Sequence, residues 1–73
     1  MPIGVYTHNH TQAIAAAEWI INHNLGTNAP AVDVYIDYEG AVRKIIPQDV
    51  IVMSNTQVKV VFSSPRTGVA AVR

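Results

Sequence analysis

The chain lacks cysteine, has few charges and contains no long hydrophobic run, and each absence excludes a class of protein. Without cysteine the 73 residues can form neither a disulfide nor a thiolate metal site. No apolar run approaches the roughly 20 residues of a membrane helix, so we expect no membrane partner. Five basic and five acidic side chains give a formal charge of zero. We therefore expect no nucleic-acid partner, because such a partner is held by clustered Lys and Arg.

The hydrophobic half of the chain is rich in β-branched residues. Eleven Val and eight Ile stand against a single leucine, Leu25, and branching at Cβ favours strands over helices. Charged residues make up 14% of the chain, below the typical value of about 25%. A domain as short as residues 1–73 buries only about 60% of its unfolded surface. We therefore predict a single all-β domain whose surface is partly covered by neighbours.

Apolar runs alternate with turn residues from Val32 to the end of the chain. We predict strands over residues 32–37, 41–46, 50–53, 57–63 and 69–72, separated by turns at Glu39-Gly40, Pro47, 54–56 and 65–68. In the fourth of these strands, Val58, Val60 and Phe62 share one face. Residues 3–9 alternate as well. Such short strands at about eight-residue spacing are typical of a sandwich or a small barrel. We predict a small antiparallel β-sandwich of six or seven strands.

The segment from Thr11 to Asn22 has two competing patterns. Ile14, Ala17, Glu18 and Ile21 recur as on one face of a helix, whereas Trp19, Ile21, His23 and Leu25 alternate as in a strand. The alanines favour a helix that Thr11 would cap. Glu18 interrupts the apolar face of that helix. The local pattern leaves helix and strand both open.

A longer pattern spans nearly the whole chain. It begins with Thr7-His8 and Gln12, continues through Trp19, Ile21, His23, Asn24, Leu25, Gly26, Pro30, Val32 and Val34, and ends with Val60, Phe62, Gly68 and Ala70. This pattern resembles a small β-sandwich module of tailed-bacteriophage virion proteins, which occurs in tail fibres, baseplates and neck or collar fibres. The chain departs from the module by inserting Asn9-His10-Thr11 before Gln12.

The resemblance implies both a fold and a function. It makes residues 18–23 a strand with Trp19, Ile21 and His23 on one inward face, and on this basis we prefer the strand to the helix. It also implies a structural protein of the virion that docks on other virion proteins at the neck, tail, baseplate or fibre attachment. Because the module stands alone here, we expect a small component of a homo-oligomer or symmetric assembly. Capsid decoration is the alternative role within the virion.

The histidines are the first candidates for chemistry. His8 and His10 share one face of a strand, and in a trimer three such pairs would offer six nitrogens to a transition metal. We prefer polar or interface roles for them and predict no metal. His23 is expected to be structural and to donate to a backbone carbonyl beneath Trp19. Since the chain has no cysteine nucleophile and no Gly-x-Ser-x-Gly elbow, we predict no enzyme and no cofactor.

The remaining candidates are interface residues. Tyr35 and Tyr38 are predicted to face outward, and with Val61 they are predicted to be covered by a neighbour. The terminal strand from Val69 to Val72 is predicted to be a sheet edge to which a partner strand adds. The alternative from another class of function is a carbohydrate-binding module, in which Trp19 or Tyr35 stacks on a sugar.

Three acidic residues, Asp33, Asp37 and Glu39, share one face of a strand and its turn. No second carboxylate cluster and no Asp-x-Asp-x-Asp-Gly loop accompanies them, which argues against glycosidase or calcium chemistry. We predict a solvated face whose carboxylates pair with Arg43 and Lys44 across the hairpin.

Overall fold

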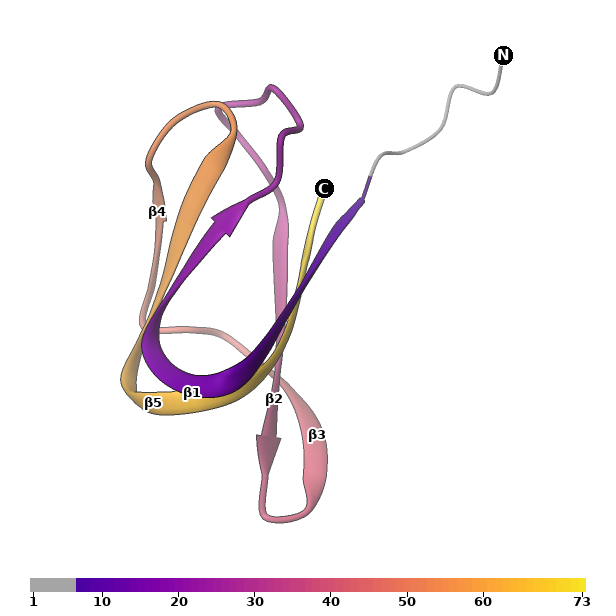
Figure 1. The fold of residues 1–73 in the computed structure, drawn as a ribbon, viewed down its shortest axis with the longest axis vertical. Coiled ribbons are helices and arrows are strands. Elements are labelled where there is room, and N and C mark those ends of the chain that lie inside the picture. The colour runs from indigo at the N-terminus through magenta and orange to yellow at the C-terminus, as the bar shows by residue number, and fades with distance from the viewer. Residues whose placement is uncertain (1–6) are drawn as a thin grey trace.

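Two long, curved strands dominate the computed structural model, which describes residues 7–73 (Figure 1). β1 (His8–Asn22) has 15 residues and β5 (Gln57–Val72) has 16, and the two strands pair antiparallel. The shorter strands are β2 (Val32–Tyr38), β3 (Ala41–Ile45) and β4 (Asp49–Val52). The described residues contain no helix, and so none that is long and apolar enough to cross a membrane.

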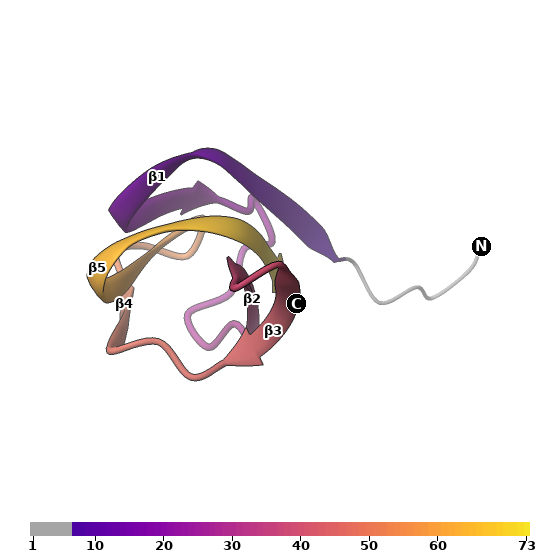
Figure 2. The same ribbon diagram turned by 90° about the horizontal axis from the view of Figure 1, so that it is seen from below.

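The five strands form one open antiparallel sheet with β5 at its centre. On one side of β5, β1 pairs with both of its halves. On the other side, β4 pairs with residues 58–61 and β2 with residues 68–72, and β3 pairs with β2. Because β1 and β5 bend together, the two ends of the sheet curl toward each other around a common interior (Figures 1 and 2).

The bend in β1 coincides with irregular pairing to β5. The register shifts between Gln12 and Ala16 and again between Ala16 and Glu18. Such bulges disrupt the ladder locally and bend the strand. The indole Nε1–H of the buried Trp19 donates to the Ala16 carbonyl at 3.0 Å and to the Arg66 carbonyl of β5 at 3.2 Å. Trp19 therefore joins the two strands where both of them bend.

Residues 11–22 belong to a strand throughout, so the helical interpretation of this segment is wrong. A helix of about three turns is marginal without tertiary packing, whereas β5 offers this segment a long-range partner for its backbone groups. Ile14, which the helical pattern would bury, is 81% exposed. Trp19, Ile21 and His23 are buried, which confirms their predicted inward face.

The turn predicted at residues 65–68 is also wrong, since β5 runs through it. Residues 62–65 have no register partner in β1, β2 or β4, so the missing N–H of Pro65 costs no ladder hydrogen bond. The segment Val69–Val72 consequently lies between β1 and β2 and is not a sheet edge. Val72 is fully buried there, so its prediction as an interface residue is wrong as well.

The prediction of an antiparallel all-β fold is confirmed. Two pairs of strands that the sequence predicts separately are each continuous: 57–63 with 69–72, and the end of 3–9 with 18–22. His23, predicted as the last residue of its strand, follows the end of β1. The residues of 3–9 that precede Thr7 lie outside the described part of the chain. Residues 7–73 thus form five strands in one open sheet and not a sandwich of six or seven.

The core fills the interior of the bent sheet. Its nine buried hydrophobic residues come from β1, β2 and both halves of β5: Trp19, Ile21, Val34, Ile36, Val58, Val60, Phe62, Ala70 and Val72. The ring centroids of Trp19 and Phe62 are 4.7 Å apart, and those of His10 and Trp19 are 5.9 Å apart. The contact of His10 with Trp19 places the two halves of β1 against each other across this interior.

Candidate functional site

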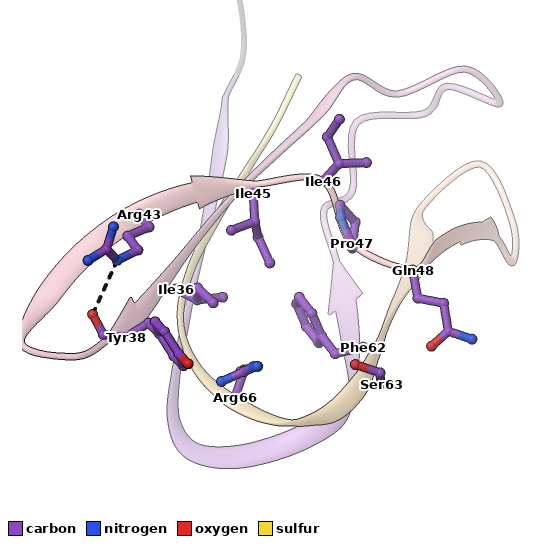
Figure 3. Close-up of a pocket in the computed structure, with 10 residues that line it drawn as sticks. All are labelled: Ile36, Tyr38, Arg43, Ile45, Ile46, Pro47, Gln48, Phe62, Ser63 and Arg66. Carbon is purple, nitrogen blue, oxygen red and sulfur yellow. Dashed lines mark hydrogen bonds between the residues drawn. The ribbon is translucent and has the colours of Figure 1, made fainter.

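An open cleft with a volume of about 510 Å³ lies between the β2–β3 hairpin and the bend of β5 (Figure 3). Its apolar floor is made by the buried Ile36 and Phe62 together with Ile45. The other lining residues are Tyr38, Arg43, Ile46, Pro47, Gln48, Ser63 and Arg66. We call this hollow the arginine cleft. The cleft therefore places two guanidinium groups, those of Arg43 and Arg66, beside an apolar floor.

Tyr38 contacts both arginines of the cleft. The guanidinium carbon of Arg66 lies 5.1 Å from the centroid of the Tyr38 ring, within the range of a cation–π contact. Arg43 Nε donates to the Tyr38 carbonyl oxygen at 3.4 Å. Arg43 reaches this side of the hairpin because it is the cross-strand partner of the buried Ile36. The two cationic groups therefore lie on either side of one tyrosine (Figure 3).

Asp33 and Asp37 lie on the opposite, outer face of the hairpin. Asp33 pairs with Lys44 at 3.5 Å and with Arg73 at 2.5 Å. Asp37 accepts a hydrogen bond from the Thr67 hydroxyl at 3.2 Å. The predicted pairing of this acidic face with Lys44 is confirmed, and Arg73 joins it from the end of the chain.

The arginine cleft is cationic although the whole chain is neutral. None of the five acidic residues, Glu18, Asp33, Asp37, Glu39 and Asp49, lines it. Within residues 7–73 neither Arg43 nor Arg66 forms an ion pair with a carboxylate, so the predicted pairing of Arg43 with the acidic face is wrong. The cleft offers apolar contact and two guanidinium groups side by side, an arrangement that suits an anionic group with an apolar part.

A second feature, the apolar edge Val50–Met53, begins one residue into β4. β4 pairs with β5 alone, so its other side is free in the described part of the chain. Val50 and Val52 are register partners of the buried Val60 and Val58 and therefore face the interior. They are nevertheless 36% and 44% exposed. The interior of the sheet is thus incompletely covered along this edge.

The predicted interface residues differ in exposure and in the face of the sheet on which they lie. Tyr38 and Val69 are exposed, whereas Tyr35 and Val61 are half-buried. Tyr35 and Val69 are cross-strand partners and line a shallow hollow of about 370 Å³ on the outer face. Tyr38 instead lies in the arginine cleft on the inner face. Trp19 has no exposed surface, so it cannot stack on a sugar.

Among the described residues, the two histidines near the start of β1 have no further metal ligand beside them. His10 Nε2 lies 2.7 Å from the side-chain oxygen of Gln12, and its ring packs against Trp19. His8 and His10 are register partners of Val72 and Ala70, so they share the inner face of the sheet. No group of three or more possible metal ligands occurs among residues 7–73.

His23 is buried at the start of the turn that follows β1. Its Nδ1 accepts a hydrogen bond from the Leu25 backbone N–H at 3.1 Å, so the prediction that it donates to a carbonyl beneath Trp19 is wrong. Its Nε2 has no partner in the described residues. Asn24 and Gly26 adopt φ angles of 55° and 66°, which close the turn before the half-buried Pro30. His23, Asn24 and Gly26 therefore shape this turn.

Sequence reasoning missed the arginine cleft. Arg66 lies in a segment whose sequence predicts a turn. Arg43 was predicted to pair with the acidic residues across the hairpin, and so was not considered for a cleft. The one available signal was the hairpin register set by Glu39-Gly40, whose φ angles of 51° and 76° fit the predicted turn. That register puts Arg43 on the side of Ile36.

Comparison with protein-family models, with curated proteins and with solved structures gave no match to this chain.

Proposed function

We propose that this chain is a structural protein of a tailed-bacteriophage virion that docks on other virion proteins at the neck, tail, baseplate or fibre attachment. The pattern that runs from Thr7 to Ala70 supports the virion role, because it resembles the module of those proteins. The apolar edge Val50–Met53 is the observation that carries docking. It combines a free strand edge with interior-facing valines that no other described residue covers fully.

The apolar edge is better suited to docking than the other free edges of the sheet. β3 carries the charged residues Arg43 and Lys44, and β1 carries Glu18 and two register shifts. Charges and bulges are the devices by which edge strands avoid pairing with other chains. β4 carries one charged residue, Asp49 at its first position, and the apolar edge from Val50 to Met53 carries none. A partner strand would therefore add beside β4 by backbone hydrogen bonds.

Strand addition would also complete the architecture that the sequence predicts. A strand from a neighbour beside β4 would be the sixth of a sandwich-like fold, and its side chains would cover Val50 and Val52. Repeated docking of this kind is compatible with a symmetric assembly of several copies. In this proposal the stability of a small domain and its function have one source, since the neighbour covers the open side of the core.

Analysis of intact particles tests the proposal. Mass spectrometry of purified particles of the phage that encodes the chain is expected to detect it at a copy number that matches a particle symmetry. Cryo-electron microscopy is then expected to place it at the neck, tail or baseplate with a neighbouring strand beside β4. Absence of the chain from repeated particle preparations would contradict the virion role. Density on the capsid shell would favour the decoration role instead.

A further inference from the structure

The arginine cleft has the composition of a site for a side chain that is partly apolar and accompanied by negative charge. Ile36 and Phe62 are only 5% and 6% exposed, yet they form its floor. A cleft that is open above nearly buried apolar residues gains free energy when an apolar group displaces its water. The floor alone would accept any small hydrophobic group.

The two arginines narrow this choice to an anionic group. Arg43 and Arg66 are two of the five basic residues, and no acidic residue lines the cleft with them. Among residues 7–73 their guanidinium groups form no ion pair, and only Arg43 Nε donates a hydrogen bond, to the Tyr38 carbonyl, so the remaining donors are free for a ligand. Guanidinium groups present paired N–H donors that match a carboxylate. Charge complementarity therefore favours a carboxylate beside the apolar group.

Tyr38 holds these donors in place before any ligand arrives. Its ring lies under the Arg66 guanidinium, and its carbonyl accepts from Arg43 Nε. No other described residue binds the terminal nitrogens of Arg43, which are therefore available to a ligand. Positions that are already restricted cost less side-chain entropy on binding.

We propose that the arginine cleft binds a partner polypeptide segment in which an aliphatic side chain stands next to an acidic one. The aliphatic group would rest on Ile36 and Phe62, and the carboxylate would bind Arg43 and Arg66. This inference rests on the proposed docking function and names the chemistry of the partner. A polypeptide is favoured over a free fatty acid because the cleft is open and continues through Ile46 and Gln48 toward the apolar edge.

Peptide titration of the isolated chain tests the inference. The probe is acetyl-Ser-Asp-Leu-Glu-Ser-amide, followed by amide chemical shifts in NMR. We expect shifts centred on the hairpin and on residues 62–66, with weak affinity in the millimolar range. The neutral peptide with Asn and Gln, and the peptide with Ala in place of Leu, are each expected to bind at least about fivefold more weakly. Equal binding of all three peptides, or no shifts at all, would overturn the proposal.

Matched protein variants locate the binding. Arg66→Gln and Arg43→Gln are each expected to weaken the acidic peptide about fivefold to tenfold. Lys59→Gln removes the same charge from a position on β5 whose register partners are Ile20 and Ile51, away from the cleft. It is expected to leave the affinity unchanged. An equal loss in Lys59→Gln would overturn the site, since it would show a general charge effect.

Two further arms test other occupants. The first arm titrates octanoate. Tight binding of octanoate, with no binding of the peptides, would show that the ligand is a free amphiphile and would overturn the proposal. Self-association of the chain that Arg66→Gln abolishes would put a second copy in the cleft, with the same consequence.

The outcome is separable from that of the virion role. If the chain binds the peptide but is absent from purified particles, the cleft proposal is supported and the virion role is contradicted. Incorporation of Arg66→Gln and Arg43→Gln into particles at the normal copy number, with no peptide binding by the isolated chain, would remove the cleft alone.

Discussion

Gly68 of β5 and Tyr35 of β2 approach so closely that a Cβ atom on Gly68 would overlap the Tyr35 carbonyl oxygen. The same atom would lie 2.8 Å from the Cα of Ile36. Both obstacles are backbone atoms of a paired strand, so neither can move aside as a flexible side chain would. The close approach explains why glycine stands in the middle of a strand, where it would otherwise weaken pairing.

Gly68→Ala is therefore expected to destabilise the fold by at least about 2 kcal/mol, because overpacking against backbone forces the strands apart. Urea unfolding followed by Trp19 fluorescence measures the change. Gly26→Ala is the comparison: its φ of 66° is strained for alanine, but its Cβ would meet no atom within 4 Å. It is expected to cost about 1 kcal/mol. A smaller loss for Gly68→Ala than for Gly26→Ala would contradict the close approach.

Trp19→Phe is expected to cost about 2 to 4 kcal/mol, because it leaves a cavity in the core and removes the donor shared by the Ala16 and Arg66 carbonyls. The free energy of unfolding from urea titration measures this, with circular dichroism as the probe in place of fluorescence. Tyr38→Phe, which removes a hydroxyl that makes no hydrogen bond with other described residues, is the control and is expected to change stability by less than about 0.5 kcal/mol. Equal losses in the two variants would show that the indole N–H does not join the bend.

His23→Leu is expected to speed hydrogen exchange at the Leu25 amide at least about tenfold, because that N–H loses its acceptor. His23→Asn is the matched variant, since its side-chain oxygen can take the place of Nδ1. It is expected to keep most of the protection. Native-state exchange followed by NMR distinguishes them. Equal exchange of the Leu25 amide in both variants would show that the acceptor at residue 23 has no role in the turn.

Val52→Lys is expected to abolish docking at the apolar edge, because an interior-facing charge on an edge strand opposes strand addition. Copy number in purified particles, measured by quantitative mass spectrometry, gives the effect. Val42→Lys provides the control on β3, where Val42 is already 70% exposed. Thermal unfolding of both isolated variants checks that the fold survives. Normal incorporation of folded Val52→Lys would remove β4 as the docking edge.

Local pattern was a reliable guide wherever neighbours in the sequence are also neighbours in space. The hairpin of β2 and β3 illustrates this: its alternation and the Glu39-Gly40 turn were both predictable, because a two-residue turn sets the register of the strands that flank it. The alternation of Val58, Val60 and Phe62 likewise predicted a buried face. The residues of the arginine cleft were not predictable in this way, because Tyr38 and Arg66 meet only through the pairing of β2 with β5.

The sequence by itself determined that this protein is all-β, through its abundance of Val and Ile and its scarcity of Leu. The period of two also determined which side of most strands faces inward. Only the tertiary structure decided that residues 11–22 extend, that β5 runs through Pro65, and that the last strand lies in the centre of the sheet. The reason is energetic. Intrinsic preferences differ by less than about 1 kcal/mol per residue, and the long pairing of β1 with β5, joined at the bend by Trp19, outweighs them. The tertiary structure also decided how the few charges are distributed. The two arginines of the cleft have no acidic residue beside them there, whereas Asp33 on the outer face forms ion pairs with Lys44 and Arg73.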